Sequence, residues 1–199
     1  MAVLPLCARL LNGQDAACVP LKRKYFQQAV VINKVDIDTM TITKTDFETE
    51  DPTCSYKVAF ELKEGATGYR FTGSENGSNY FGRFNKTTSD LGFASYAHEV
   101  QMLVVGADEI SKCILESLDK GSYLVALQFT DGTVEIYGAE NGLSTGDYTY
   151  SIAENGGGTA IVLSSNEQTP ESYLPLVYVS SVPGEEGADF DAAFENPSS

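Results

Sequence analysis

The sequence predicts a mainly β fold of the α+β class, with a single helix. Its 11 Tyr and 10 Phe without any Trp, and its 18 Gly against 7 Pro, favour strands joined by tight turns. Several segments alternate apolar and polar residues with the period of two that half-buried strands require. Only one segment has apolar residues at helical spacing.

The first predicted β region spans residues 22–45, which are rich in β-branched side chains. One or two strands are expected there, with Val35, Ile37 and Ile42 as core contacts. An acidic turn with Pro52 follows at 46–53.

The clearest strand signal lies at residues 54–63, where one face is apolar and the other polar. Residues 65–73 then predict a turn and a short strand that returns as the second arm of a hairpin. The next 20 residues, 73–92, gather Gly, Asn and Ser without periodicity, which is long for a connection inside a compact domain. A loop of this kind is expected to be disordered or to make a contact elsewhere.

Residues 93–105 predict another long strand, with His98 in phase with Tyr96 and Val100 on its apolar face. The helix is expected at 108–119, with Asp108 as its N-cap. Its apolar residues at helical spacing are Ile110, Cys113, Ile114 and Leu118.

The rest of the chain returns to β structure. Strands at 122–129 and 133–138 flank an Asp-Gly pair, a strong hairpin signal. Further strands are expected at 148–153, 158–165 and 172–182. Pro175 suits an edge or a bulge of the last strand, because it cannot donate to a ladder.

Residues 1–182 therefore form one predicted domain, and residues 183–199 a flexible tail with five acids and no base. The N-terminus lacks a basic stretch before its apolar residues and is a poor signal peptide. No apolar run reaches the about 20 residues of a membrane span.

The net charge of −15 is uneven. Residues 1–100 carry 11 basic and 12 acidic side chains, whereas residues 101–199 carry 2 basic and 16 acidic ones. Binding of the DNA backbone needs cations that displace phosphate counterions, so specific nucleic-acid binding is not expected.

The residue types that commonly serve in catalysis or metal binding do not have the spacing that known sites of these kinds show. His98 is the one histidine, and Glu99 points to the opposite strand face, so the two form no dyad. The four cysteines form no CxxC pair, and the acidic segments lack the spacing of an EF-hand loop. We expect no catalytic residue, no metal site and no cofactor, and therefore no enzyme.

Two regions resemble a family. Residues 7–34 (CARLLNGQDAACVPLKRKYFQQAVVINK) pair a short Cys-containing lead-in with a basic and aromatic strand. Residues 122–170 combine a hydrophobic strand, an Asp-Gly turn, a Glu-Asn-Gly-Leu turn and a Thr-Pro turn, and residues 75–84 (ENGSNYFGRF) agree in placement. Together they resemble the tail tube proteins of tailed bacteriophages that infect Bacteroidetes-type hosts. The acidic extension after Pro183 and the segment 151–165 depart from that pattern.

The resemblance implies an antiparallel β-sandwich or half-barrel with one flanking α-helix, a homo-oligomer of hexameric rings stacked into a tube. Its partners would be copies of itself, other tail proteins and DNA in passage, in a virion tail assembled in the host cytoplasm. Strand edges closed by neighbours and an acidic channel that does not retain DNA fit this function.

On this reading the polar faces of the strands at 54–63 and 93–105 line the channel, with Glu61, Glu99 and Gln101 as lumen residues. The loop between them makes the contact between rings, through Asn76, Asn79, Tyr80, Phe81, Arg83 and Phe84. The alternative is a virion binding or attachment module, such as a tail hub, terminator, decoration or fibre-associated protein, that forms no tube.

Overall fold

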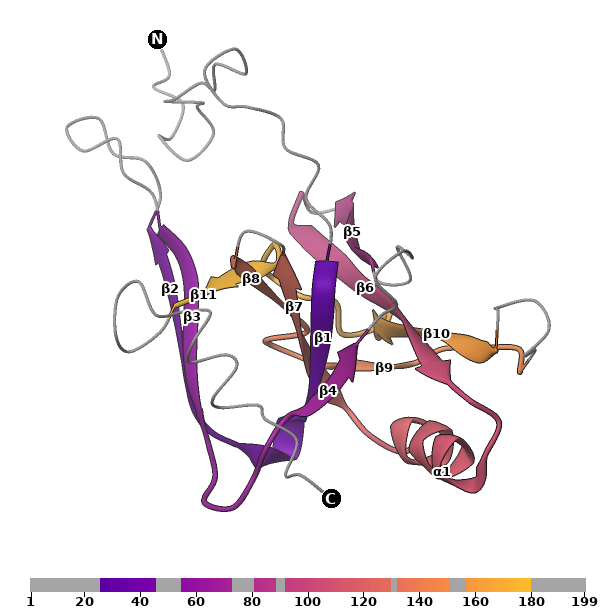
Figure 1. Ribbon diagram of the computed structural model, residues 1–199. Helices are drawn as coiled ribbons and strands as arrows, with labels where there is room; N and C mark the ends of the chain where they lie inside the picture. Colours follow the sequence, from indigo (N-terminus) through magenta and orange to yellow (C-terminus); the bar gives the residue numbers. More distant parts are fainter. Residues whose placement is uncertain are drawn as a thin grey trace, which may run out of the picture.

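The computed structural model describes residues 26–45, 55–72, 81–88, 92–129, 132–150 and 157–179. Strands dominate this part of the chain, and one α-helix accompanies them (Figure 1). The elements are β1 (Phe26–Asn33), the 3-10 helix η2 (Lys34–Asp36), β2 (Ile37–Thr45), β3 (Ser55–Leu62), β4 (Tyr69–Thr72), β5 (Phe81–Thr88), β6 (Ala94–Val105), α1 (Glu109–Leu118), β7 (Tyr123–Phe129), β8 (Val134–Tyr137), β9 (Leu143–Thr145), β10 (Gly158–Ser165) and β11 (Leu176–Tyr178).

The strands form one mixed sheet in which β2-β3-β11-β8-β7-β9-β10-β6-β5 are successive neighbours. Two further strands branch from it, since β1 pairs with β7 and β4 pairs with β1. All pairs are antiparallel except β3 with β11. The predicted hairpin of residues 122–138 is confirmed as β7 and β8, with Val125 opposite Tyr137.

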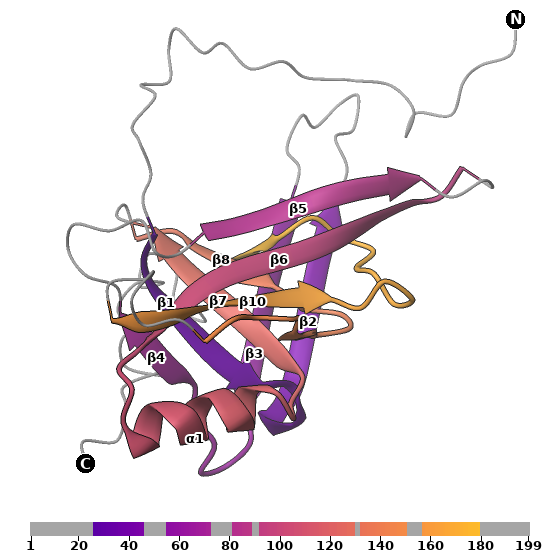
Figure 2. The same ribbon diagram turned by 90° about the vertical axis from the view of Figure 1, so that its right-hand side faces the viewer.

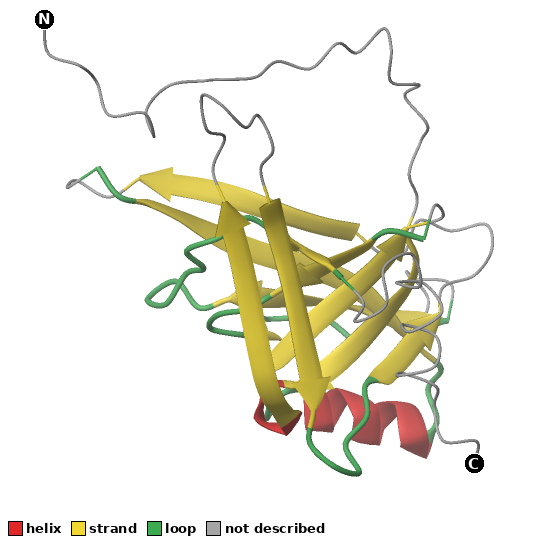
Figure 3. Ribbon diagram, turned by 90° about the vertical axis from the view of Figure 1, so that its left-hand side faces the viewer, coloured by secondary structure: helices red, strands yellow, loops and turns green. Residues whose placement is uncertain are grey.

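The sheet curls so that β1 and β7 are buried on both faces. One face packs on β6, β10 and α1, with Val31, Met102 and Ile161 among the buried contacts. The other face packs on β2, β3 and β11, with Ile32 and Val58 in that second core. Figure 3, which faces β2 and β3, shows this pair lying in front of the other strands. The result is a β-sandwich-like, β-rich fold with one helix, as the sequence predicts.

Strand β6 confirms the expected alternation. His98, Val100, Met102 and Val104 are buried, and the residues between them are half-exposed. In β3, Val58 is buried while Lys57 and Glu61 are exposed, also as the alternation predicts.

The helix begins after Asp108, whose side chain accepts a hydrogen bond from the Ser111 amide at 2.8 Å, as expected of an N-cap. The predicted apolar stripe is only partly correct. Leu118 is buried and Ile114 packs on the core, but Ile110 and Cys113 are exposed. Helix α1 turns the face of Ser111, Leu115 and Leu118 towards the sheet instead.

Several predicted pairings and boundaries are wrong. The predicted hairpin of β3 and β4 does not form. β4 pairs with β1 instead, where Tyr69 lies opposite Val31 and Phe71 lies on the same face. Val35 lies in η2 and is 74% exposed, since the 3-10 turn directs it away from the sheet.

Two further differences concern the C-terminal strands. Residues 148–150 form no strand, and residues 151–153 lie outside the described part. The short strand β9 lies before them, at Leu143–Thr145. β11 lies between β3 and β8 and is no edge, and Pro175 precedes it, where no ladder donor is needed. The predicted acidic tail at 183–199 also lies outside the described residues.

Candidate functional site

The predicted lumen residues lie on two separate strands. Glu61 is exposed on β3, on the same face as Lys57, and opposite Thr39 of β2. Glu99 and Gln101 are half-exposed on β6. Five strands lie between β3 and β6 in the hydrogen-bonded order, so the structure does not bring the two sets together within one chain.

Glu99 is not a free carboxylate. Arg83, directly opposite on β5, donates from Nε to Glu99 Oε2 at 2.6 Å and forms a salt bridge with it. Asn85 Nδ2 donates to the other carboxylate oxygen at 3.4 Å. The pair is partly exposed, so its contribution to stability is small, but it neutralises the charge that β6 would present.

Eight residues of the predicted inter-ring loop form a strand, β5 (Phe81–Thr88). Phe81, Arg83 and Phe84 belong to β5, which pairs with β6 through all eight of its residues. Asn76, Asn79 and Tyr80 lie outside the described residues. The sequence lacked a period of two here because β5 is exposed on both faces from Arg83 to Thr88, so no face needs to be apolar.

The two ends of the sheet path are long edge strands. β2 has nine residues and pairs only with β3, and β5 has eight and pairs only with β6, within the part of the chain that the structure describes. β2 presents the exposed threonines Thr39, Thr41 and Thr43 on its outer face. β5 carries Arg83 and Lys86 and no acid.

β5 and β6 also form a projecting arm. In Figure 2 the ends of β5 and β6 that meet at the hairpin turn extend beyond β1, β2 and β3, away from α1. Phe84 is 44% exposed and meets Tyr96 edge to face, with ring centroids 6.0 Å apart. Phe93, beside the turn, is 71% exposed. We call residues 84–88 and 93–97 the aromatic arm.

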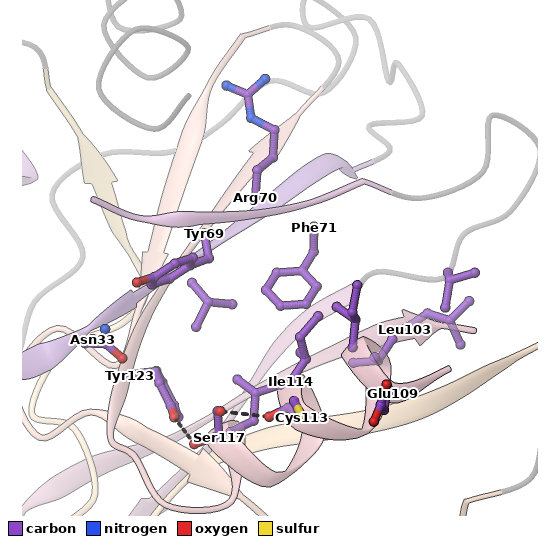
Figure 4. A pocket seen from close by; sticks show the side chains of 15 residues that line it. Asn33, Tyr69, Arg70, Phe71, Leu103, Glu109, Cys113, Ile114, Ser117 and Tyr123 are labelled. Atoms are coloured by element: carbon purple, nitrogen blue, oxygen red, sulfur yellow. Dashed lines mark hydrogen bonds between the residues drawn. The ribbon is translucent and has the colours of Figure 1, made fainter. Parts of the chain in front are cut away.

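A groove of about 880 Å³ lies between α1, β4 and the end of β6 (Figure 4). It is mainly apolar, and β4 approaches β6 there without a ladder between them. Tyr123 donates to the Ser117 carbonyl at 2.7 Å, and Ser117 Oγ donates to the Cys113 carbonyl at 2.7 Å. Its lining includes Tyr69, Phe71, Leu103, Ile110, Cys113 and Ile114.

A buried polar cluster that sequence analysis missed lies elsewhere, between β6 and the turn after β8. Glu171 is fully buried and accepts hydrogen bonds from the amides of Glu140 and Asn141, both at 2.8 Å. Burial raises the pKa of Glu171, and these amide hydrogen bonds act against that rise. Lys34 Nζ donates to the carbonyls of Ala139 and Glu140. No local pattern marks Glu171, because its partners are about 30 residues away.

His98 is the other member of this region, and its buried position agrees with the structural role expected from the sequence. Nδ1 accepts from the Gly138 amide at 3.2 Å and Nε2 donates to the Tyr173 carbonyl at 2.9 Å. Both ring nitrogens are therefore engaged by backbone groups, which leaves neither for proton transfer to a substrate.

Among the described residues, no group of three or more His, Cys, Asp or Glu side chains is arranged to hold a metal ion. The helix described here is too short to cross a bilayer. No protein-family model, curated protein or solved structure matches the chain. The described features that bear on function are thus the edge strands, the aromatic arm and the groove.

Proposed function

We propose that the chain is a structural subunit that assembles with copies of itself into rings, in the manner of a phage tail tube. The observation that carries the proposal is the pair of long edge strands, β2 and β5, at the two ends of one sheet. Long edges are templates for pairing with another chain, and proteins normally shorten, cover or charge them.

The edges differ in sequence, which favours a head-to-tail contact. β2 of one copy would extend the sheet of the next copy at β5, and such a heterologous contact closes into a ring when the rotation between copies allows it. β5 offers Arg83 and Lys86, whereas the outer face of β2 is neutral and threonine-rich. β2 also carries one acid, Asp38, and one base, Lys44, so its own charges balance and no net charge opposes the pairing.

The proposed ring encloses a channel for DNA, in a virion tail assembled in the host cytoplasm. The support is electrostatic: the chain carries a net charge of −15, and an acidic wall does not retain a polyphosphate. Glu61, Glu99 and Gln101 remain the proposed lumen residues. Arg83 reduces the contribution of Glu99, so Glu61 is the stronger carboxylate of the set.

Electron microscopy of the purified protein tests the assembly directly, with rings or stacked tubes as the expected result. Thr41→Lys places a cation on β2 against the basic β5 and should shift the protein towards monomers. Thr41→Glu is the matched control, which should assemble at least as well as the parent chain. Equal assembly of both variants would contradict pairing of β2 with β5.

The lumen assignment needs a separate test. Glu61→Lys combined with Gln101→Lys should leave folding intact, since neither side chain is buried, and should slow genome delivery. Glu99→Lys is unsuitable for this test, because it would place a cation directly opposite Arg83 of β5. Unchanged delivery by the double variant would remove Glu61 and Gln101 from the lumen.

The groove favours a second candidate, a virion attachment module of the hub, terminator, decoration or fibre-associated kind. Its volume of about 880 Å³ and apolar lining suit a segment of another protein. A stable monomer or trimer at high concentration, without rings, would favour this function over the tube.

A further inference from the structure

The groove between α1, β4 and β6 leaves apolar surface uncovered among the described residues (Figure 4). Tyr69 on one side and Ile110 on the other are 50% and 69% exposed. Val105, at the end of β6, lines the same groove and is 63% exposed. Apolar surface gathered in one place normally has a partner. A segment of complementary composition is therefore expected to cover it.

The N-terminal stretch of the sequence has that composition. Nine of residues 1–11 are apolar, six of them large (Val, Leu or Met), and Arg9 is the only charged side chain. Outside residues 1–25, the stretches that the structure does not describe hold at most one large apolar side chain each, apart from 180–199, which has three. An apolar run of this kind needs cover from water as much as the groove does.

Charge separates the two ends of the chain as candidates. Residues 180–199 carry five acidic side chains and no base, whereas residues 1–25 carry four bases and one acid. Within the lining, Arg70 and Glu109 balance each other. The rest of α1 with its flanking residues adds three carboxylates against two ammonium groups: Asp108, Glu116 and Asp119 against Lys112 and Lys120. These slightly acidic surroundings disfavour the C-terminal stretch and favour the N-terminal one.

The length of chain before β1 allows the contact within one copy. β1 runs from Phe26 to Asn33, and Val31 and Asn33 line the groove. Its seven residue steps cover about 23 Å at about 3.3 Å per residue. Residues 12–25 can span up to about 45 Å when extended, which is ample. A tethered segment has an effective concentration on the order of millimolar, so it occupies the groove ahead of a segment from another copy.

We infer that residues 1–11 dock in the groove between α1 and β4 of the same copy. The leucine side chains of the segment cover the exposed surfaces of Tyr69 and Ile110, and the apolar area removed from water holds the contact. The inference goes beyond the proposed self-assembly and does not depend on it. A groove filled in this way is closed to other proteins, which weighs against the attachment module.

Two cysteines of the chain test the contact, since Cys7 lies in the segment and Cys113 lines the groove and is exposed. In a chain with Cys18→Ala and Cys54→Ala, mild oxidation should join Cys7 to Cys113, because a disulfide needs Cα atoms within about 7 Å. The control chain also carries Cys113→Ala and Ala59→Cys, on the exposed face of β3. The disulfide to Cys113 should form about tenfold faster or more, as read by non-reducing gels and peptide mass mapping.

Alkylation of Cys113 measures occupancy of the groove without depending on the register of the segment. The other three cysteines are replaced by Ala for this measurement. Leu6→Asp combined with Leu10→Asp should speed the alkylation about tenfold or more, because burying the new charges in the groove is unfavourable and the segment leaves it. Ala16→Asp combined with Ala17→Asp adds the same charge outside the apolar run and is the control, with an unchanged rate.

The disulfide within one chain and the accelerated alkylation are both required, and failure of either overturns the inference. Faster alkylation with Phe190→Asp and Phe194→Asp instead would assign the groove to residues 180–199 and also overturn it. Disulfides that join different chains, with protection of Cys113 that rises with protein concentration, would overturn docking within one copy. Ring formation is independent of these results, so electron microscopy tests the proposed function separately.

Discussion

The imidazole of His98 joins two segments that the sequence places far apart. Its Nδ1 accepts a hydrogen bond from the Gly138 amide at 3.2 Å, while Nε2 faces the Tyr173 carbonyl at 2.9 Å. An amide can only donate, so Nδ1 is unprotonated and the ring is the neutral Nε2–H tautomer. His98 thereby connects β6 to the turn after β8 and to the segment before β11.

This arrangement predicts that stability falls on mild acidification. Burial lowers the pKa of His98 to about 4, although the hydrogen bond to Tyr173 acts in the opposite direction. An unfolded histidine titrates near 6.5, so between about pH 6.5 and 4 the unfolded chain binds the extra proton. The free energy of unfolding should therefore decrease by about 2–3 kcal/mol across this window. Urea unfolding at pH 7 and pH 4.5 measures it.

Carboxylates also titrate near the lower limit, so the control is His98→Gln measured at the same two pH values. The variant should lose much of the pH dependence while it is less stable at pH 7. An identical slope in both proteins would show that His98 does not cause it.

Glu171→Gln should destabilise the fold by about 1–3 kcal/mol. The carboxylate accepts from the amides of Glu140 and Asn141 in a fully buried site, and glutamine would direct an NH₂ group at one of these N–H donors. Thermal unfolding measures the effect. The exposed Glu167→Gln is the matched control and should leave the melting temperature unchanged; equal effects would contradict the role assigned to Glu171.

Gly82→Ala should loosen β5 from the body. A Cβ at this position would lie 2.4 Å from Tyr137 Cζ and 2.8 Å from Leu127 Cδ1, and Tyr137 is buried, with its hydroxyl bonded to Glu135. Overpacking of this kind costs about 1–3 kcal/mol. Hydrogen exchange of the β5 amides should increase in this variant. Gly146→Ala, where the nearest atom would be 4.0 Å away, is the control and should show no change.

Asp108→Ala should cost about 1 kcal/mol, because the helix loses the cap on the Ser111 amide. Asp108→Asn retains the acceptor oxygen and should be close to neutral. Urea unfolding of the two variants compares them directly. If asparagine were as harmful as alanine, the charge at the helix N-terminus, and not the hydrogen bond, would carry the effect.

Local patterns were sufficient wherever one face of an element meets the core. The alternation in β3 and β6, the Asp-Gly hairpin of β7 and β8, and the helix with its Asp108 cap all follow from neighbours in sequence. Each of these signals is a period or a capping pattern within about a dozen residues. The β-rich class with one helix was predictable for that reason.

Where the chain lacks such a pattern, the prediction failed. β5 exposes both faces beyond Gly82 and so has no period, which makes its sequence resemble that of a loop. Ile110 and Cys113 have helical spacing but line a groove, because the packing of α1, not its composition, decides which residues meet the sheet.

The strand-forming segments, the helix and the acidic charge of this protein follow from its sequence. The pairing of β4 with β1, the positions of β2 and β5 at the two ends of the described sheet, and the burial of Glu171 against a turn 30 residues away follow from the tertiary fold alone. Strand order and buried polar contacts depend on pairs of residues far apart in the chain. The free energy of such pairs depends on which surfaces pack together on folding. A local period in the sequence carries no information about that packing.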